Sequence, residues 1–364
     1  MSTVVLSAGG TGGHLFPAQA LAAELMRRGK RIVVMTDARA KNYGQAFPGT
    51  VIETVPSASF ASRSPLVLVR APFEILGGVV VALSKLRRLK PAAVIGFGGY
   101  PSLPVMIAAR LAGLPTAIHE QNAVLGRVNR LVVDGVRAVA ASFPFARFAP
   151  RDQSRIAFTG NPVRPEATAL ASSAYEAPAG NAPIRLLVFG GSQGARALSE
   201  LVPAAIAQLP EDLCRRLEIV QQCRPEDIDS VRAAYQRANV KVELASFFSD
   251  LPRRMADAHL VIARSGASTV SELAVIGRPA ILIPYPFATD DHQTANADVL
   301  AKAGAAWAIQ QRDLTAEGLA TLLREIFAHP AGLAARAAAA HALGKPDAAS
   351  RLADVVEKLA GGAP

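Results

Sequence analysis

Three loops in this sequence could bind an anion through backbone N–H groups. They are Gly9–His14 (Gly-Gly-Thr-Gly-Gly-His), Gly190–Gly194 (Gly-Gly-Ser-Gln-Gly) and Arg264–Glu272. Each follows a short apolar run and precedes a helical pattern, and free N–H groups at a helix start favour negative charge. A tight turn explains any one loop alone. Three of them at predicted strand ends favour an anionic ligand, because open α/β sheets bind ligands at that edge.

The first loop matches neither of two common nucleotide-binding motifs. It lacks the Gly-Lys-Ser/Thr of a P-loop, which argues against triphosphate hydrolysis. It also departs from G-x-G-x-x-G, because Leu15 occupies the third glycine position. A different diphosphate-binding arrangement is therefore expected.

Polar side chains near these loops could act on a sugar. His14 adjoins the first loop and is the best candidate for a general base, since an imidazole can accept a proton near neutral pH. His119–Asn122 (His-Glu-Gln-Asn) offers donors and acceptors to sugar hydroxyls, or it caps a loop. Glu272 could accept two vicinal hydroxyls, as on a ribose, or complete a capping box with Ser268.

Metal chemistry is not expected. Asp290, Asp291 and His292 could bind a metal, but a helix N-cap before Thr294 fits them better. Asp227-Ile228-Asp229 resembles the Asp-x-Asp of metal-dependent sugar transferases, yet it opens a helical pattern, where residues two apart point to different faces. Leaving-group charge would then be neutralised by helix N-termini and arginine.

Composition indicates two globular domains with an uneven charge. The chain has 364 residues, of which 51% are hydrophobic and 19% charged, so general disorder is excluded. Two cysteines fit a reducing compartment. The net charge is +10, and residues 1–160 hold 19 Lys and Arg against 7 Asp and Glu. This basic half fits nucleic acid, an acidic lipid surface, a phosphorylated substrate, or simply a solubility surface.

Neither a signal peptide nor a spanning helix is predicted. The start of the chain has no basic region, and the uncharged stretch Pro91–Ala109 is interrupted by three prolines and three glycines. Residues 65–91 combine apolar positions with Lys85, Arg87, Arg88 and Lys90 at the end. An interfacial helix on anionic lipid has this pattern, and a buried crossover helix explains its apolar part equally well.

The elements that must position these residues alternate between strand and helix, which predicts right-handed βαβ units and parallel sheets. The predicted strands are Val4–Ser7, Ile32–Thr36, Val94–Gly96, Thr116–His119, Val136–Ala141, Ile184–Phe189, Glu218–Gln221, Val240–Leu244, Leu260–Ala263 and Ala280–Pro284. Helical periodicity is clear in Pro17–Arg28, Ala197–Leu209 and Pro225–Ala238. We predict an α/β fold with domains at 1–162 and 163–344 and a C-terminal helix in 345–364 that could pack back on the first domain.

Taken in order, these motifs resemble those of the MurG family, the UDP-N-acetylglucosamine–N-acetylmuramyl-(pentapeptide) pyrophosphoryl-undecaprenol N-acetylglucosamine transferases. The segments that carry the resemblance span nearly the whole chain and are Gly9–His14, Gly98–Tyr100, His119–Asn122, Gly160–Arg164, Gly190–Arg196, Arg264–Glu272 and Gln293/Asn296. The resemblance implies a GT-B fold, two Rossmann-like domains facing a cleft. It also implies metal-independent, inverting transfer of GlcNAc from UDP-GlcNAc to lipid I, which gives lipid II, with no cofactor and no nucleic acid. The basic first half would then rest on the anionic, cytoplasmic membrane surface.

The resemblance also assigns site residues. His14 would be the catalytic base, with Tyr100, His119 and Glu120 facing the acceptor. The residues implied for UDP-GlcNAc are Thr11, Gly12, Gly13, Asn122, Arg164, Ser192, Phe248, Ala267, Ser268, Thr269, Val270, Ser271, Glu272 and Gln293.

Three segments depart from the family pattern: Gln221–Arg224 replaces Gln-Ser-Gly, Tyr100–Pro104 replaces Tyr-x-Ser-Gly-Pro, and His292-Gln293 replaces Gln-Gln. Two rival functions remain at this point. A UDP-sugar 2-epimerase of the same architecture would act on the donor alone, and a non-catalytic basic protein would bind membrane or nucleic acid without UDP affinity.

Overall fold

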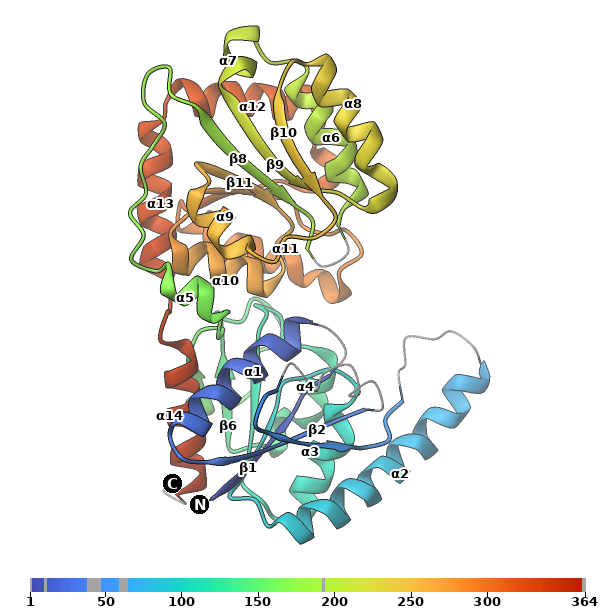
Figure 1. Ribbon diagram of the computed structural model, residues 1–364. Helices are drawn as coiled ribbons and strands as arrows, with labels where there is room; N and C mark the ends of the chain where they lie inside the picture. The colour runs from blue at the N-terminus through green and yellow to red at the C-terminus, as the bar shows by residue number, and fades with distance from the viewer. Residues whose placement is uncertain (1, 10–11, 38–46, 59–64, 192–193, 362–364) are drawn as a thin grey trace. The chain divides into compact units, whose positions relative to one another are not determined.

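The protein is described from a computed structural model covering residues 2–9, 12–37, 47–58, 65–191 and 194–361. The chain divides into two compact units (Figure 1). Unit 1 comprises Met1–Arg164 and Lys345–Pro364, and unit 2 comprises Pro165–Gly344. The boundary expected from the sequence lies between residues 162 and 163.

Unit 1 contains a parallel sheet of seven strands in the order β3-β2-β1-β4-β5-β6-β7. Val5 in the central strand pairs with Val33 on one side and Val94 on the other. The strand order reverses between β1 and β4, as in doubly wound nucleotide-binding sheets. The strands are β1 (Thr3–Ser7), β2 (Arg31–Thr36), β3 (Val51–Thr54), β4 (Ala93–Gly96), β5 (Thr116–Glu120), β6 (Ala138–Ala141) and β7 (Ile156–Phe158).

Helices cover both faces of this sheet. One face packs against α1 and α14, and the other packs against α2, α3 and α4. Alternation along β1 divides the two cores, because Val4 and Leu6 point to the first and Val5 to the second. The helices are α1 (Gly12–Arg27), α2 (Pro65–Leu89), α3 (Ser102–Leu111), α4 (Arg127–Val132) and α14 (Ala348–Ala360).

The C-terminal helix α14 is an integral part of unit 1. It lies beside α1 (Figure 1), and Leu352, Val356 and Leu359 complete the core on that face. At the edge of the contact, Arg28 pairs with Asp354 at 2.6 Å and Glu357 at 2.8 Å. Burial of the apolar stripe supplies most of the stabilisation, and the ion pairs fix the register of the two helices.

Unit 2 repeats the same plan in a six-stranded parallel sheet, ordered β10-β9-β8-β11-β12-β13. The order reverses between β8 and β11. The strands are β8 (Ile184–Phe189), β9 (Leu217–Gln222), β10 (Lys241–Ala245), β11 (Leu260–Ala263), β12 (Ala280–Leu282) and β13 (Ala306–Ala308).

The helices of unit 2 also pack as in a doubly wound sheet. Side chains of α6, α8 and α12 form one core with Leu186 and Val188 of β8, and α10 packs against α9, α11 and α13. The helices are α5 (Pro165–Ala169), α6 (Arg196–Ile206), α7 (Glu211–Arg216), α8 (Ile228–Arg237), α9 (Leu251–Asp257), α10 (Ala267–Ile276), α11 (His292–Lys302), α12 (Ala316–Ala328) and α13 (Ala331–Leu343). The two-sheet α/β fold predicted from the sequence is confirmed.

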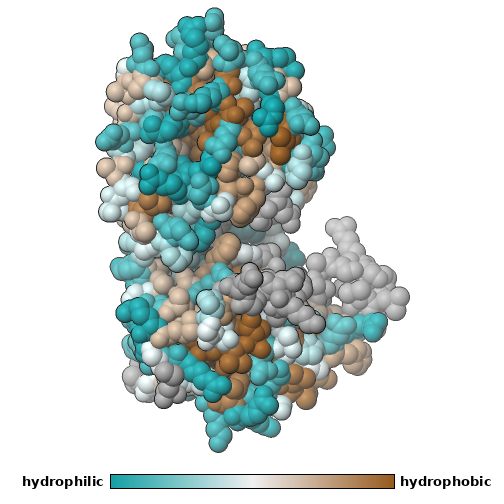
Figure 2. Space-filling model, viewed as in Figure 1, coloured by the Kyte–Doolittle hydropathy of each residue, from teal (hydrophilic) through white to brown (hydrophobic). Residues whose placement is uncertain are grey.

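Helix α2 buries one face and exposes another. Val79, Ala82 and Leu86 lie in the core, whereas Phe73, Leu76 and Val80 are 74%, 62% and 61% exposed. The spacing of Phe73, Leu76 and Val80 places them on one side of α2. Apolar residues gather along this helix at the lower right of Figure 2. In the part of the chain that the structure describes, no helix is long and apolar enough to cross a bilayer.

Candidate functional site

The loops singled out in the sequence lie at the strand-order reversals of the two sheets. In unit 1, Gly9 follows β1 and Gly12 begins α1, and Gly98–Tyr100 follows β4. In unit 2, Gly190–Gly194 follows β8, and Arg264–Gly266 follows β11. Parallel sheets leave a crevice outside the carboxyl ends of the strands at such a reversal. Each unit therefore has the place where a doubly wound sheet binds its ligand.

His14 lies in the first turn of α1, which begins at Gly12. The sequence predicted a later start, at Pro17, because the glycines carry no apolar signal; the structure corrects this, so Gly12 and Gly13 belong to the helix. Nδ1 of His14 lies 3.0 Å from Oε1 of Gln121, at the end of β5. This contact joins the glycine loop to the polar segment after β5.

Close backbone approach shapes the space around His14. Gly98 and Gly99 have φ of +84° and +77°, which side chains rarely adopt. A Cβ on Gly99 would also lie 2.6 Å from the carbonyl oxygen of Gly9, and one on Gly98 would lie 3.3 Å from Cε1 of His14. These glycines let the loops after β1 and β4 pack together beside the imidazole.

His119 is completely buried behind Gln121. Its Nε2 lies 3.2 Å from the carbonyl oxygen of Gly160, and its Nδ1 lies 3.0 Å from Nε2 of Gln121. Burial lowers the pKa of His119 to about 4. The ring is therefore neutral at pH 7, and it is enclosed in unit 1 rather than facing an acceptor as the resemblance implied.

Glu120 is likewise enclosed, with 1% of its surface exposed. Its carboxylate accepts hydrogen bonds from Asn129 Nδ2 at 2.8 Å and from the backbone N–H groups of Gly126 and Asn122 at 2.8 and 3.1 Å. A buried carboxylate with several N–H partners holds its loop in place. Glu120 thus positions Asn122, and the expectation that its side chain faces the acceptor does not fit this geometry.

In unit 2, helix α10 begins directly after the loop that follows β11. Gly266 is the N-cap, and no side chain caps the helix among the described residues. The capping box considered for Ser268 and Glu272 is therefore not formed. The backbone N–H groups of the first turn have no partner within the helix, which is the arrangement that favours a phosphate.

Glu272 lies in the second turn of α10 and is 3% exposed. Ser271 beside it is 6% exposed, and its hydroxyl is buried with no hydrogen-bond partner among the described residues. Ala267 and Val270 are buried, while Ser268 and Thr269 are half-buried. The helix thus combines N–H donors at its start with a carboxylate one turn further along.

The glycine loop after β8 is tied to its neighbours by Gln222, which ends β9. The backbone N–H of Gly190 donates to Oε1 of Gln222 at 3.3 Å, and Nε2 of Gln222 donates to the carbonyl of Ser246 at 3.1 Å. A Cβ on Gly190 would lie 2.4 Å from the backbone nitrogen of Ala195. Only glycine fits at position 190, because its backbone lies against Ala195 at the start of α6.

The loop before α10 is held from α11. Ser265 Oγ donates to the carbonyl of Gln293 at 2.8 Å, and Asn296 Nδ2 donates to the carbonyl of Ser265 at 3.1 Å. The Gln293 side chain accepts from the backbone N–H of Tyr285 at 2.9 Å. Gln293, expected to contact a sugar, thus lies at the same sheet edge as the start of α10.

Two arginines support this edge of unit 2. Arg264 is 7% exposed and donates to the carbonyls of Ile283 and Pro284 at 3.0 Å each. Burial lowers the pKa of its guanidinium. Phe248, expected near a base, is 7% exposed and lies under the guanidinium of Arg254, 4.3 Å from ring centroid to carbon.

The remaining predicted residues are distributed as follows. Tyr100 is half-buried against the α3 side of unit 1, Asn122 is half-buried beside Glu120, and Arg164 is the last residue of unit 1 before α5. Thr11 and Ser192 lie outside the described residues. Across the described ranges, no group of three His, Cys, Asp or Glu side chains could hold a metal ion. The carboxylate Asp227 instead pairs with Arg224 at 2.7 Å.

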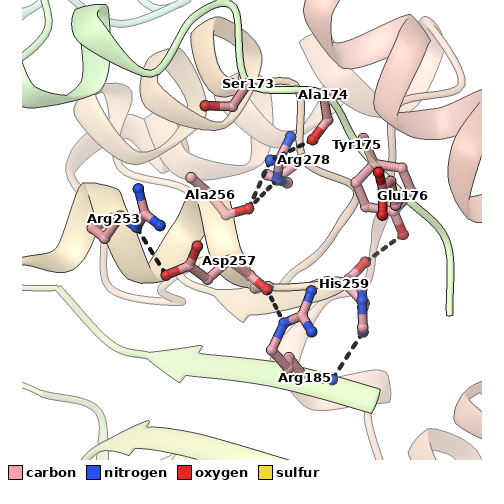
Figure 3. Close-up of a pocket in the computed structure, with 11 residues that line it drawn as sticks. Ser173, Ala174, Tyr175, Glu176, Arg185, Arg253, Ala256, Asp257, His259 and Arg278 are labelled. Atoms are coloured by element: carbon pink, nitrogen blue, oxygen red, sulfur yellow. Dashed lines mark hydrogen bonds and ion pairs between the residues drawn. The ribbon is translucent and has the colours of Figure 1, made fainter. Parts of the chain in front are cut away.

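A cavity of about 260 Å³ lies at the opposite ends of the strands of unit 2 (Figure 3). Arg278 there donates to the backbone carbonyls of Ala256 and Ile276, and the Tyr175 hydroxyl donates to the carbonyl of His259. These bonds attach the segment before β8 to the sheet. The Arg278 guanidinium and the Tyr175 hydroxyl in its lining are thus used within the protein, where this segment joins the sheet.

Three residues organise the site in ways that the sequence did not indicate: Gln121 and Arg264 were considered only as members of candidate binding loops, and Gln222 only as part of a segment that departs from the family pattern. All three are buried. Each follows or ends a predicted strand, and a long polar side chain at a strand end was the only signal that could have identified them.

Comparisons with known proteins agree with this geometry. Residues 4–141 match the glycosyltransferase family 28 N-terminal domain, and residues 185–352 match the glycosyltransferase family 28 C-terminal domain. A protein of Paramagnetospirillum magneticum named UDP-N-acetylglucosamine–N-acetylmuramyl-(pentapeptide) pyrophosphoryl-undecaprenol N-acetylglucosamine transferase is 51% identical over 357 residues, 98% of this chain and 96% of that one. A protein of Nitrobacter hamburgensis with the same name is 51% identical over 358 residues, 98% and 97% of the two chains.

Solved structures extend the likeness. The crystal structure of Acinetobacter baumannii MurG matches with a TM-score of 0.81 at 32% identity, covering 98% of this chain and 100% of that one. S. aureus MnaA, in a co-structure with UDP, has a TM-score of 0.65 at 12% identity over 98% and 96% of the two chains. At this low identity, the match with MnaA shows only that the two proteins share a fold.

Proposed function

The chain belongs to the UDP-N-acetylglucosamine–N-acetylmuramyl-(pentapeptide) pyrophosphoryl-undecaprenol N-acetylglucosamine transferases of glycosyltransferase family 28, and from this membership we propose how its residues carry out the transfer. The enzyme moves GlcNAc from UDP-GlcNAc to the 4-hydroxyl of the MurNAc sugar of lipid I, which gives lipid II for peptidoglycan synthesis.

Unit 2 binds the donor. The observation that carries this assignment is the uncapped start of α10 at the strand-order reversal, with Glu272 one turn beyond it. N–H groups of α10 and of the loop at Gly190 donate hydrogen bonds to the diphosphate, and the Glu272 carboxylate accepts hydrogen bonds from the ribose hydroxyls. Gln293 contacts the GlcNAc, and the backbone around Phe248 borders the uracil. Ser192 and Arg164 add contacts to the diphosphate, and Thr11 and Asn122 complete the donor site.

Unit 1 supplies the base. The acceptor hydroxyl attacks the anomeric carbon in a single displacement, which inverts that centre, while His14 takes the hydroxyl proton and UDP departs. Tyr100 contributes to acceptor binding. His119 and Glu120 act from inside unit 1, by holding Gln121 and Asn122 in place.

The transfer needs no metal ion. Negative charge develops on the departing diphosphate, and fixed N–H dipoles at two helix starts can stabilise it without a cation. Activity should therefore survive an excess of chelator. A loss of turnover restored by added Mg²⁺ would overturn this part of the proposal.

The protein acts as a peripheral enzyme on the cytoplasmic face of the membrane, where the diphosphate of lipid I is accessible. The exposed stripe Phe73, Leu76 and Val80 on α2 and the basic residues at its end support this placement. Glu53 pairs with Lys85 and Arg88, so only part of that basic cluster is available to lipid phosphates.

The deciding experiment has two steps with the purified full chain. Calorimetric titration with UDP and UDP-GlcNAc should show binding, and labelled GlcNAc should then transfer to a lipid I analogue. Incubation with UDP-GlcNAc alone tests the epimerase alternative, which requires release of UDP and free sugar without lipid. Salt-dependent binding of nucleic acid without UDP affinity would contradict the enzyme assignment altogether.

A further inference from the structure

We propose that Gln121 is a positioning residue for the transfer: its side-chain amide holds His14 in the tautomer that carries hydrogen on Nδ1 and leaves Nε2 unprotonated. His119 holds the amide in turn. The inference rests on the proposed function, in which His14 accepts the proton of the acceptor hydroxyl, and it concerns which ring nitrogen does so.

The orientation of the Gln121 amide is set by two backbone carbonyls. Its Nε2 lies 3.2 Å from the carbonyl oxygen of Phe97 and 3.1 Å from that of His119. Carbonyl oxygens only accept hydrogen bonds, so the amide nitrogen and not its oxygen must face them. Oε1 is then directed at Nδ1 of His14, 3.0 Å away. Because Oε1 also only accepts, Nδ1 must donate and must carry the hydrogen.

The His119 ring leads to the same orientation independently. Its Nε2 faces the carbonyl oxygen of Gly160 at 3.2 Å and must donate to it. The neutral ring then has a lone pair on Nδ1, which accepts from the Gln121 amide at 3.0 Å. Burial keeps this ring neutral by lowering its pKa to about 4. A hydrogen on Nδ1 of His119 would instead point at the hydrogens of the Gln121 amide. The opposite amide orientation, with Oε1 toward His119, would then be favoured.

The consequence for catalysis lies in the Nε2 atom of His14. With hydrogen fixed on Nδ1, the lone pair of the neutral ring is on Nε2. When Nε2 accepts a proton, the bond from Nδ1 to Gln121 remains, so the ring need not rotate during the transfer. A ring free to adopt the other tautomer would present a hydrogen in place of the lone pair.

The tautomer can be read directly by NMR in protein labelled with ¹⁵N-histidine, which contains six histidines. His14 is assigned from the signal missing in His14→Gln. We expect wild-type His14 to show a protonated Nδ1 and an unprotonated Nε2 at a pH where the ring is neutral. The opposite pattern in the folded wild-type chain overturns the inference, and this measurement needs no variant of Gln121.

Two matched variants separate positioning from general loss of structure. Gln121→Leu removes the acceptor and should release the tautomer, lowering kcat about 10- to 100-fold while the Kd for UDP stays unchanged. Gln222→Leu removes the corresponding buried amide of unit 2, and it should weaken UDP binding while leaving the His14 tautomer as in wild type. A folded Gln121→Leu chain with wild-type kcat contradicts the inference.

The outcomes distinguish this inference from the proposed function. If the wild-type chain transfers GlcNAc to lipid I but His14 carries hydrogen on Nε2, only the positioning role fails. If the tautomer is as expected but no transfer occurs, the proposed function fails and the assignment of the hydrogen bonds stands.

Discussion

Nδ1 of His14 and Oε1 of Gln121 lie 3.0 Å apart and connect the start of α1 to the end of β5. The loop after β1 and the polar segment after β5 are 107 residues apart in sequence, yet this contact places them at one edge of the sheet. The imidazole is half-buried there. The relationship makes His14 the most informative residue to remove.

Replacing His14 with Ala should lower kcat by about 10²- to 10⁴-fold, the usual contribution of a general base. The Kd for UDP should not change, because the proposed uridine and ribose contacts lie in unit 2. The measurement is transfer of labelled GlcNAc to a lipid I analogue, with His329→Ala as the control, since His329 is exposed at the end of α12. Near-normal turnover of His14→Ala would remove it from the base role.

Glu272 should bind the donor through its ribose. Glu272→Gln replaces a charge-assisted acceptor with a neutral amide, and we expect the Kd for UDP to rise about tenfold. The 2′,3′-dideoxyribose analogue of UDP provides the matched ligand, because it lacks the two hydroxyls. Its affinity should be the same for wild type and variant. An equal loss for both ligands would mean that Glu272 acts by supporting α10 instead.

Gly190 and Gly266 of unit 2 differ in how much space there is for the Cβ atom that a substitution by alanine would add. In Gly190→Ala the new Cβ would lie 2.4 Å from the nitrogen of Ala195, so the loop must shift and UDP binding should fall even though the ligand is not touched. Gly266 has φ −62°, and a Cβ on it would meet no described atom within 4 Å, so Gly266→Ala should leave the melting temperature unchanged. Weaker UDP binding by a stable Gly266→Ala chain would locate the diphosphate close to the start of α10.

The sequence predicts the central strands of both sheets. It also identifies the loops that follow these strands and contain the candidate site residues. The central strands β1, β4 and β11 have every residue buried or nearly so, and β8 departs from this only at the exposed Arg185. The edge strands β3, β7 and β13 were missed, since they have three or four residues and exposed positions. The glycine-rich loops lie at the carboxyl ends of the strands in both units, as their place after predicted strands indicated.

Side-chain partners were not predictable in the same way. His119 and Glu120 stood among polar neighbours and suggested a surface for sugar hydroxyls, but β5 is buried along its whole length and encloses both side chains. Sequence spacing gives the alternation of a strand, and only the neighbouring strands and loops decide whether both of its faces are covered.

Acid should destabilise unit 2 through His259. This residue is 6% exposed, and burial, followed by the charges of Arg185 and Arg278, lowers its pKa from 6.5 to about 4. The unfolded chain therefore binds a proton below pH 6.5 that the folded chain does not bind until about pH 4. The stabilisation is complete above pH 6.5, and the free energy of unfolding should fall by about 3 kcal/mol as pH drops from 6.5 to 4.

The matched variant for this prediction is His259→Asn. Nδ1 of His259 accepts from the backbone N–H of Arg185 at 3.0 Å, and an asparagine oxygen can take its place without titrating. Denaturant unfolding followed at several pH values should show a smaller acid-induced loss for the variant. An identical pH dependence of unfolding in wild type and variant would show that groups other than His259 cause the loss of stability in acid.

The stripe on α2 should control membrane association. Leu76→Glu and Val80→Glu place carboxylates on exposed positions, so folding should be retained while binding to vesicles with anionic lipid is lost. Sedimentation with phosphatidylglycerol vesicles measures this, and Leu131→Glu, which alters another exposed leucine of unit 1, is the control. If the chain carrying both Leu76→Glu and Val80→Glu sediments with the vesicles as the wild type does, α2 does not contact lipid.

Helix α14 gives unit 1 a core assembled from both ends of the sequence. Leu352, Val356 and Leu359 complete the face of the sheet that begins with Val4 and Leu6. During synthesis, residues 1–164 therefore leave the ribosome with only α1 over that face and the part beneath α14 uncovered, and the whole of unit 2 is made before α14 exists. Unit 2 can finish folding first even though it is encoded second, and a nascent chain stalled before residue 345 would expose an apolar surface that chaperones recognise.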